Sequence, residues 1–114
     1  MARSDEDRLA HMLAEARRAT SLIEGRTRED LDSDDVLVLA LTRLLEILGE
    51  AAKGVSAETR ARHPNVPWSQ MAATRDRLIH GYFSVDLDII WEIIGHDLPP
   101  VIDALGAIAP DEEE

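Results

Sequence analysis

Apolar side chains recur every three or four positions through most of the chain, the spacing that aligns them along one face of an α-helix. The first such stretch covers residues 5–24, and Gly25 follows it as a residue type that commonly ends helices. Its apolar positions are Leu9, Met12, Leu13, Ala16 and then Ala19 or Leu22. We therefore predict an amphipathic first helix, followed by a polar connector over residues 26–32.

The most apolar stretch, residues 34–53, predicts a second helix that ends at Gly54. Ser33 is expected to cap its N-terminus, with acidic residues in the first turn. Apolar residues cover so much of the helix circumference that we expect burial on two sides, within the bundle and against a second subunit. The pattern therefore favours a homodimer.

A third helix is predicted to begin at Pro67. It follows a connector that contains Pro64 and a short helical turn capped by Ser56. Trp68, at the start of this helix, is expected to anchor the core, with base stacking as the alternative. Apolar positions after it give the third helix a core face.

A last helix is predicted to begin at Ser84 or Asp86. Pro99 and Pro100 are expected to kink or restart it, because proline lacks the backbone N–H that a helix interior requires. Strand signals are nearly absent. The fold class predicted is all-α, an antiparallel bundle of four or five helices.

Length and composition fit a single helical domain, which we expect over residues 1–110, with an acidic disordered tail at residues 111–114. The chain has no cysteine, which excludes disulfides, thiolate nucleophiles and cysteine-bound zinc. Its charged N-terminus leads into no apolar signal core, and no apolar run reaches membrane length. A cytoplasmic location without a membrane partner is predicted.

Candidate chemistry gathers in residues 75–82. Cleaving a phosphodiester without a metal needs a group that moves protons near neutral pH and a cation for the charge that grows on phosphorus; His80 and Arg75 supply these. On a continuous helix, Arg75 and Tyr82 would share one face, and Asp76 would lie one turn from His80 and orient its ring. The same residues also fit a surface cation, a helix-end dipole partner and a half-buried aromatic.

The convergence of Arg75 and His80 requires a special geometry, since five positions separate them by roughly 140° around an ideal helix. Their side chains meet only if Arg75 reaches across, if the helix ends nearby, or if two subunits each donate this segment to a shared interface. Gly81 would suit a helix end.

The net charge of −11 opposes a nucleic-acid role, because phosphate binding usually draws on clustered cations. Residues 60–82 depart from this balance, with a single acid, Asp76, among four arginines. The arginines are Arg60, Arg62, Arg75 and Arg77. We expect a local basic patch on an acidic body, with weak general affinity for nucleic acid and cleavage confined to one site.

Glu46 and Glu50 lie one turn apart on the second predicted helix and have two interpretations. They are either solvated acids or partners for arginines on a facing helix; we favour the second for Glu50, because an unpaired buried carboxylate is costly. Arg43 shares this ambiguity. Asp86 and Asp88 fit the start of a helix better than a metal pair.

The remaining histidines, His11, His63 and His96, are isolated in the sequence and form no zinc pattern. A Gly-rich phosphate loop is also missing. We therefore expect no metal and no cofactor.

The spacing of Arg75, His80 and Tyr82 gives an R-x-x-x-x-H-x-Y motif. With it, several segments make nearly the whole chain similar to the HepT family of the HEPN superfamily. These are residues 45–53, 66–68, 74–83, 85–91 and 97–99. The resemblance implies a HEPN-like homodimer in which two copies of the motif meet in a cleft and cut RNA without a metal, with Arg75 and His80 as catalytic residues.

In that interpretation His80 moves a proton, Arg75 stabilises the phosphorane, and the products are a 2′,3′-cyclic phosphate and a 5′-hydroxyl. Asp76 and Glu50 would support the site. The resemblance also implies an MntA-like minimal nucleotidyltransferase antitoxin as partner, which adds AMP to Tyr82 and joins the dimer in a larger assembly. Added phosphate beside Arg75 would silence the toxin by charge and bulk.

Two alternatives from other functional classes stay open. The bundle is either a non-catalytic helical partner of a nucleotidyltransferase, which the net acidity favours, or a nucleotide-sensing HEPN domain. In the second case Arg75 holds a phosphate and nothing is cut.

Overall fold

The protein is described by a computed structural model that covers residues 4–80 and 84–108, with the side chains of residues 79, 80 and 84 outside that description. The helices are α1 (Asp5–Leu22), α2 (Asp30–Ser33), α3 (Asp35–Gly54), α4 (Ala57–Arg62), α5 (Trp68–Ala72), α6 (Thr74–Leu78), α7 (Leu87–Glu92), the π-helical turn η1 (Ile93–Asp97) and α8 (Leu98–Ile108). Two strands of two residues each, β1 (Ile79–His80) and β2 (Ser84–Val85), pair antiparallel. The predicted all-helical class is confirmed apart from this hairpin.

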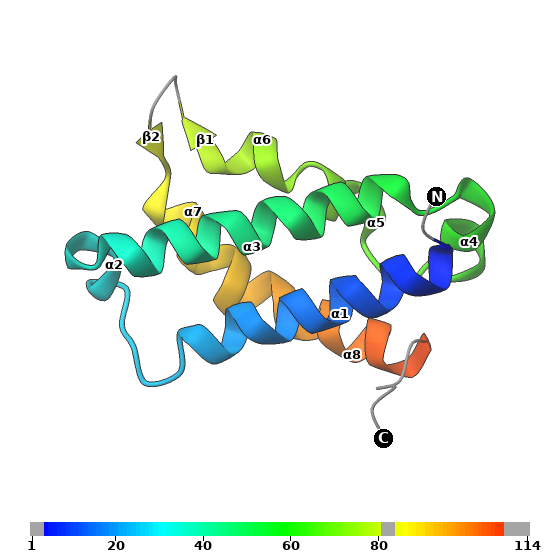
Figure 1. Ribbon diagram of the computed structural model, residues 1–114, viewed down its shortest axis with the longest axis horizontal. Coiled ribbons are helices and arrows are strands. Elements are labelled where there is room, and N and C mark those ends of the chain that lie inside the picture. The colour runs from blue at the N-terminus through cyan, green and yellow to red at the C-terminus, as the bar shows by residue number, and fades with distance from the viewer. Residues whose placement is uncertain (1–3, 81–83, 109–114) are drawn as a thin grey trace.

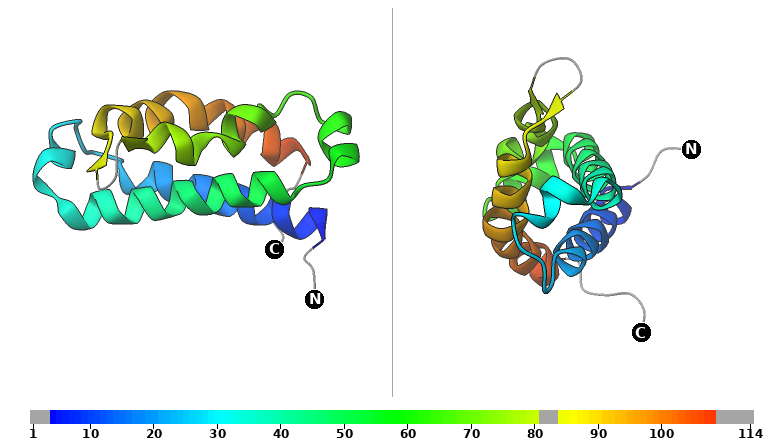
Figure 2. Two further views of the ribbon diagram at one scale, coloured as in Figure 1. Left: turned by 90° about the horizontal axis from the view of Figure 1, so that it is seen from above. Right: turned by 90° about the vertical axis from the view of Figure 1, so that its left-hand side faces the viewer.

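The two longest helices, α1 and α3, run antiparallel along the length of the molecule (Figure 1). On its other side α1 packs against α8, whereas α3 also carries α5 and α6. The helices thus enclose a core between them when the molecule is viewed end-on (Figure 2). This arrangement places α6 and the β-hairpin on the α3 side of the bundle.

Polar side chains cap the helices where acids and serines precede apolar runs. The Oγ of Ser56 accepts the Thr59 amide at 3.1 Å, and Asp86 Oδ1 accepts the Ile89 amide at 3.1 Å, as predicted. The predicted Ser33 cap of α3 is wrong. Asp34 takes that role and accepts the Leu37 amide at 3.0 Å, because Ser33 is the last residue of the one-turn helix α2.

The core consists of the apolar stripes that the sequence pattern picks out. On α3 these are Leu37, Leu41, Leu44, Leu45, Leu48 and Ala52. Trp68 is buried, and its indole N–H donates to the backbone carbonyl of His63 at 2.9 Å. The prediction that Trp68 anchors the core is therefore confirmed, with its one polar atom satisfied.

The last helical run passes from α7 through η1 into α8 without a break in helical conformation. In a regular α-helix the rings of Pro99 and Pro100 would crowd the carbonyls of Gly95 and His96, four residues earlier. The wider π turn lies at this point and gives those rings room. The predicted disturbance at the prolines therefore takes the form of a π turn.

Among the described residues, no helix has both the length and the apolar character that crossing a membrane requires.

Candidate active site

The segment that carries the candidate chemistry changes conformation within itself. Helix α6 ends at Leu78, and Ile79 and His80 form β1, paired with Val85 and Ser84 of β2. The Asp86 amide donates to the Leu78 carbonyl at 2.8 Å and closes the base of the hairpin. The two strands lie at the edge of the bundle, beyond its helical body (Figure 2).

This conformation excludes a continuous helix through His80, one of the geometries considered, and agrees with the alternative in which the helix ends nearby. The expected one-turn spacing of Asp76 and His80 does not exist, because His80 belongs to a strand. With about 1.5 Å per residue in a helix and about 3.3 Å in a strand, the Cα atoms of Arg75 and His80 are about 11 Å apart along the chain path. The His80 side chain and all of Tyr82 lie outside the described residues. Their meeting with Arg75 stays a prediction.

Arg75 lies in the first turn of α6 and is exposed, as is Asp76 beside it. In the described part of the chain, no carboxylate lies within ion-pair distance of the Arg75 guanidinium. Its charge and its planar set of donors are therefore available to a phosphate.

The inner face of α6 is fixed by burial. Thr74 and Leu78, four positions apart, are 3% and 0% exposed, and the Thr74 hydroxyl donates to the Gln70 carbonyl of α5 at 3.2 Å. Burial of these two residues turns Arg75 and Asp76 to the outside.

A glycine of α3 lets the end of α5 approach closely. A Cβ at Gly49 would lie 3.1 Å from the backbone carbonyl oxygen of Met71. Helix α5 stops one residue later, at Ala72, and α6 begins at Thr74. The close contact with α3 therefore coincides with the break between the two short helices.

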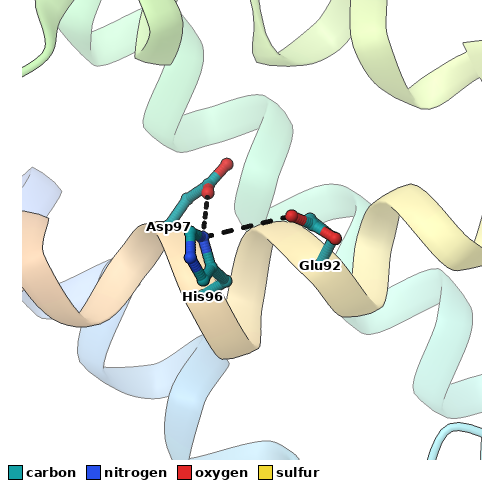
Figure 3. Close-up of side chains that lie close together, drawn as sticks. All are labelled: Glu92, His96 and Asp97. Carbon is teal, nitrogen blue, oxygen red and sulfur yellow. Dashed lines mark hydrogen bonds and ion pairs between the residues drawn. The ribbon is translucent and has the colours of Figure 1, made fainter.

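Asp97 links both short helices to the π turn. Its Oδ2 accepts from Arg77 NH1 of α6 at 3.1 Å and from Gln70 Nε2 of α5 at 3.2 Å. The other oxygen, Oδ1, lies 3.1 Å from Nδ1 of His96 (Figure 3). Sequence reasoning did not find Asp97, because its partners are 20 and 27 positions away.

The expectation that His96 is isolated is wrong. Its ring lies beside the carboxylates of Glu92 and Asp97, and donor atoms of the three residues lie within 4.8 Å of one another (Figure 3). The hydrogen bond to Asp97, with the nearby charge of Glu92, raises the pKa of His96 above its ordinary value. Nitrogen and carboxylate donors suit a zinc-like ion, although Glu92 and His96 are exposed and Asp97 already pairs with Arg77.

The other candidate acids take ordinary structural roles. Asp86 caps α7, and Asp88 Oδ1 accepts from Arg28 Nε at 2.7 Å, in keeping with the helix-start interpretation. Glu50 is exposed and lies 3.9 Å from Lys53 of the same helix, and the described residues hold no pairing of Glu50 with an arginine of a facing helix. Glu46 likewise pairs within its helix, with Arg43 at 3.6 Å.

The four arginines expected to form one basic patch are divided. Arg60 and Arg62 belong to α4, at one end of the bundle, whereas Arg75 and Arg77 belong to α6 (Figure 1). Arg77 is also paired with Asp97. The local cation at the candidate site is therefore Arg75.

Comparison with known proteins gives a consistent result. The sequence matches the family described as "Ribonuclease HepT-like" over residues 12–108. It is 40% identical over 103 residues to "Probable ribonuclease HepT" of Thermococcus cleftensis, covering 87% of this chain and 90% of that protein. It is 44% identical over 91 residues to "Putative RNase TTE0752" of Caldanaerobacter subterraneus subsp. tengcongensis, covering 80% of this chain and 81% of the relative. No solved structure matches the chain.

Proposed function

Because the chain belongs to the HepT-like family of ribonucleases, we propose that it is a metal-independent endoribonuclease toxin that cuts RNA with Arg75 and His80. The observation that carries this proposal is the exposed guanidinium of Arg75, which has no carboxylate partner among the described residues, on a helix whose inner face is buried. His80 follows five positions later, as the last residue of β1.

In the proposed reaction the 2′-hydroxyl of a ribose attacks the adjacent phosphorus and the bond to the 5′-oxygen breaks. His80 takes the proton of the hydroxyl or supplies one to the leaving oxygen, and Arg75 balances the negative charge that builds on the phosphorane. The products are a 2′,3′-cyclic phosphate and a 5′-hydroxyl. Asp76, exposed beside Arg75, is a supporting residue.

We further propose that two chains form the active enzyme. Val36 and Leu39 of α3 are 76% and 70% exposed, and a second copy packed over them would remove this apolar surface from water. Both lie in the same half of α3 that α7 and the hairpin approach (Figure 1). A partner on this face would bring a second motif close to the first.

Cleavage of RNA in the presence of EDTA tests the reaction. We expect cleavage by the wild-type protein and its loss in Arg75→Ala and His80→Ala, with cyclic phosphate ends on the products. Arg62→Ala is the matched control, since Arg62 is also an exposed arginine but belongs to α4. Equal cleavage by wild type and His80→Ala would reject the role of that histidine.

Silencing would come from an MntA-like nucleotidyltransferase that transfers AMP to Tyr82. The added phosphate would pair with Arg75 and crowd the site. Intact-mass measurement after incubation with the partner and ATP should show added adenylate on the wild-type chain and none on Tyr82→Phe. Adenylate on the phenylalanine variant would place the modification elsewhere.

The net charge of −11 favours a second candidate, a non-catalytic bundle that only docks the nucleotidyltransferase. Expression without the partner separates the two. A toxin arrests growth, and Arg75→Ala relieves the arrest; a docking module leaves growth unchanged.

A further inference from the structure

Helix α6 is too short to define its own position. It has five residues, whereas isolated helices shorter than roughly 12–15 residues are marginal in water. Ala73 separates it from α5, and β1 follows it directly. The position of Arg75 must therefore be imposed by the contacts that α6 makes with the rest of the bundle.

Burial of Thr74 and Leu78 fixes which face of α6 turns inward, but apolar packing tolerates sliding and rotation. A directional contact is needed to fix the helix along its axis. Among the described residues, the ion pair of Arg77 and Asp97 is a directional side-chain contact of this kind, and it joins α6 to η1.

The Asp97 carboxylate is well placed for this role. Its side chain is 15% exposed and that of Arg77 is 31% exposed, so the pair is shielded more than an ordinary surface pair. One oxygen of Asp97 accepts hydrogen bonds from both Arg77 and Gln70, so a single carboxylate ties α5 and α6 to the π turn. His96 Nδ1 lies 3.1 Å from the second oxygen and holds the carboxylate orientation (Figure 3).

We infer that Asp97 is a positioning residue for cleavage, acting through Arg77 and Gln70 to hold α6 so that Arg75 meets the scissile phosphate. The inference rests on the proposed ribonuclease function. Asp97 itself touches no reacting atom. Misplacement of a catalytic group by about 1 Å costs on the order of 100-fold in rate, so loosening α6 should act on turnover.

The test compares cleavage by wild type, Asp97→Asn, Arg77→Gln and the double variant. We expect kcat to fall about 10- to 100-fold in each single variant while KM stays within about twofold, because the substrate-binding surface is kept. The double variant should lose no more than either single one, since both remove the same contact. Arg77→Lys keeps the charge and should recover most of the loss.

The control is Asp103→Asn, which removes an exposed carboxylate of α8. Hydrogen exchange of the backbone amide of residue 77, which bonds the Ala73 carbonyl at 3.1 Å, reports directly on α6 and should speed up in Asp97→Asn but not in Asp103→Asn. Wild-type kcat in Asp97→Asn, with Arg75→Ala inactive, would overturn the inference and leave the proposed function intact. Losses that multiply in the double variant would also overturn it. If wild type cuts no RNA, the proposed function fails and the positioning role fails with it.

Discussion

Replacement of Gly49 by alanine sets two opposite effects against each other. In the middle of α3, alanine is favoured over glycine by about 1 kcal/mol of helix propensity. The new Cβ, however, would lie 3.1 Å from the Met71 carbonyl oxygen, with the Ala72 carbonyl oxygen and the Thr74 Cβ each 3.9 Å away. The nearest of these atoms is backbone and cannot rotate aside.

The cost of that contact decides whether Gly49→Ala raises or lowers the free energy of unfolding. Extra methyl groups in a well-packed site usually cost about 1–3 kcal/mol, so we expect a net destabilisation of about 1 kcal/mol in Gly49→Ala. Gly106→Ala is the matched control, because the one atom of the described residues within 4 Å of its Cβ would be a side-chain nitrogen of Arg17 at 3.9 Å, an ordinary contact. It should be stabilised by up to about 1 kcal/mol.

Urea unfolding measures both variants, and a fixed chain concentration keeps the mass-action contribution of any oligomer comparable between them. With a slope of about 2 kcal/mol per molar urea, the midpoint of Gly49→Ala should fall by about 0.5 M and that of Gly106→Ala should rise. If Gly49→Ala is stabilised as much as Gly106→Ala, the contact between α3 and the end of α5 is looser than argued, and the break at Ala73 has another cause.

Three further outcomes follow from individual contacts. The folded-state pKa of His96 is raised by its hydrogen bond to Asp97. The protonated ring therefore stabilises the fold below the unfolded-state pKa, and this contribution is lost as pH rises through the folded-state pKa. An NMR titration should show the raised pKa, and Asp97→Asn should bring it back toward the ordinary range. The pKa of Asp5 is lowered mainly by its hydrogen bond from Ser56. We therefore expect Asp5→Asn to be less stable than wild type near neutral pH, and the difference should vanish as pH falls through the folded-state pKa. Denaturation of both proteins at several pH values measures this. Leu45→Ala, at a fully buried position of α3, should cost about 2–5 kcal/mol in urea unfolding; a smaller loss would mean that the core closes over the cavity.

Helical periodicity predicted the long elements because each repeats its pattern over several turns. α1 and α3 begin and end within a few residues of the predicted bounds. Gly25 follows α1 with a φ of 75°, a conformation that favours glycine. The caps at Ser56 and Asp86 and the buried Trp68 were likewise readable, because their causes are local in sequence, whereas the Ser33 cap was wrong by one residue.

The candidate site was less predictable because its geometry depends on distant residues. Neither proline nor glycine marks the break at Ala73; the close approach at Gly49 accompanies it. Strands of two residues are too short to show an alternating pattern, and β-branched Ile79 and Val85 were the available signal. The roles of Arg75 and His80 came from a motif, and the side chain of His80 lies outside the described residues, so their convergence remains a prediction.

The order of residues along the chain has a consequence for a nascent polypeptide. Asp97 follows Arg77 by 20 positions, so the ribosome adds residues 75–82 to the growing chain before it adds Asp97. Chains are made from the N-terminus, and a five-residue helix does not persist without its tertiary partners. A chain that stops before Asp97 would therefore contain the whole motif but lack the carboxylate that ties α6 to the π turn.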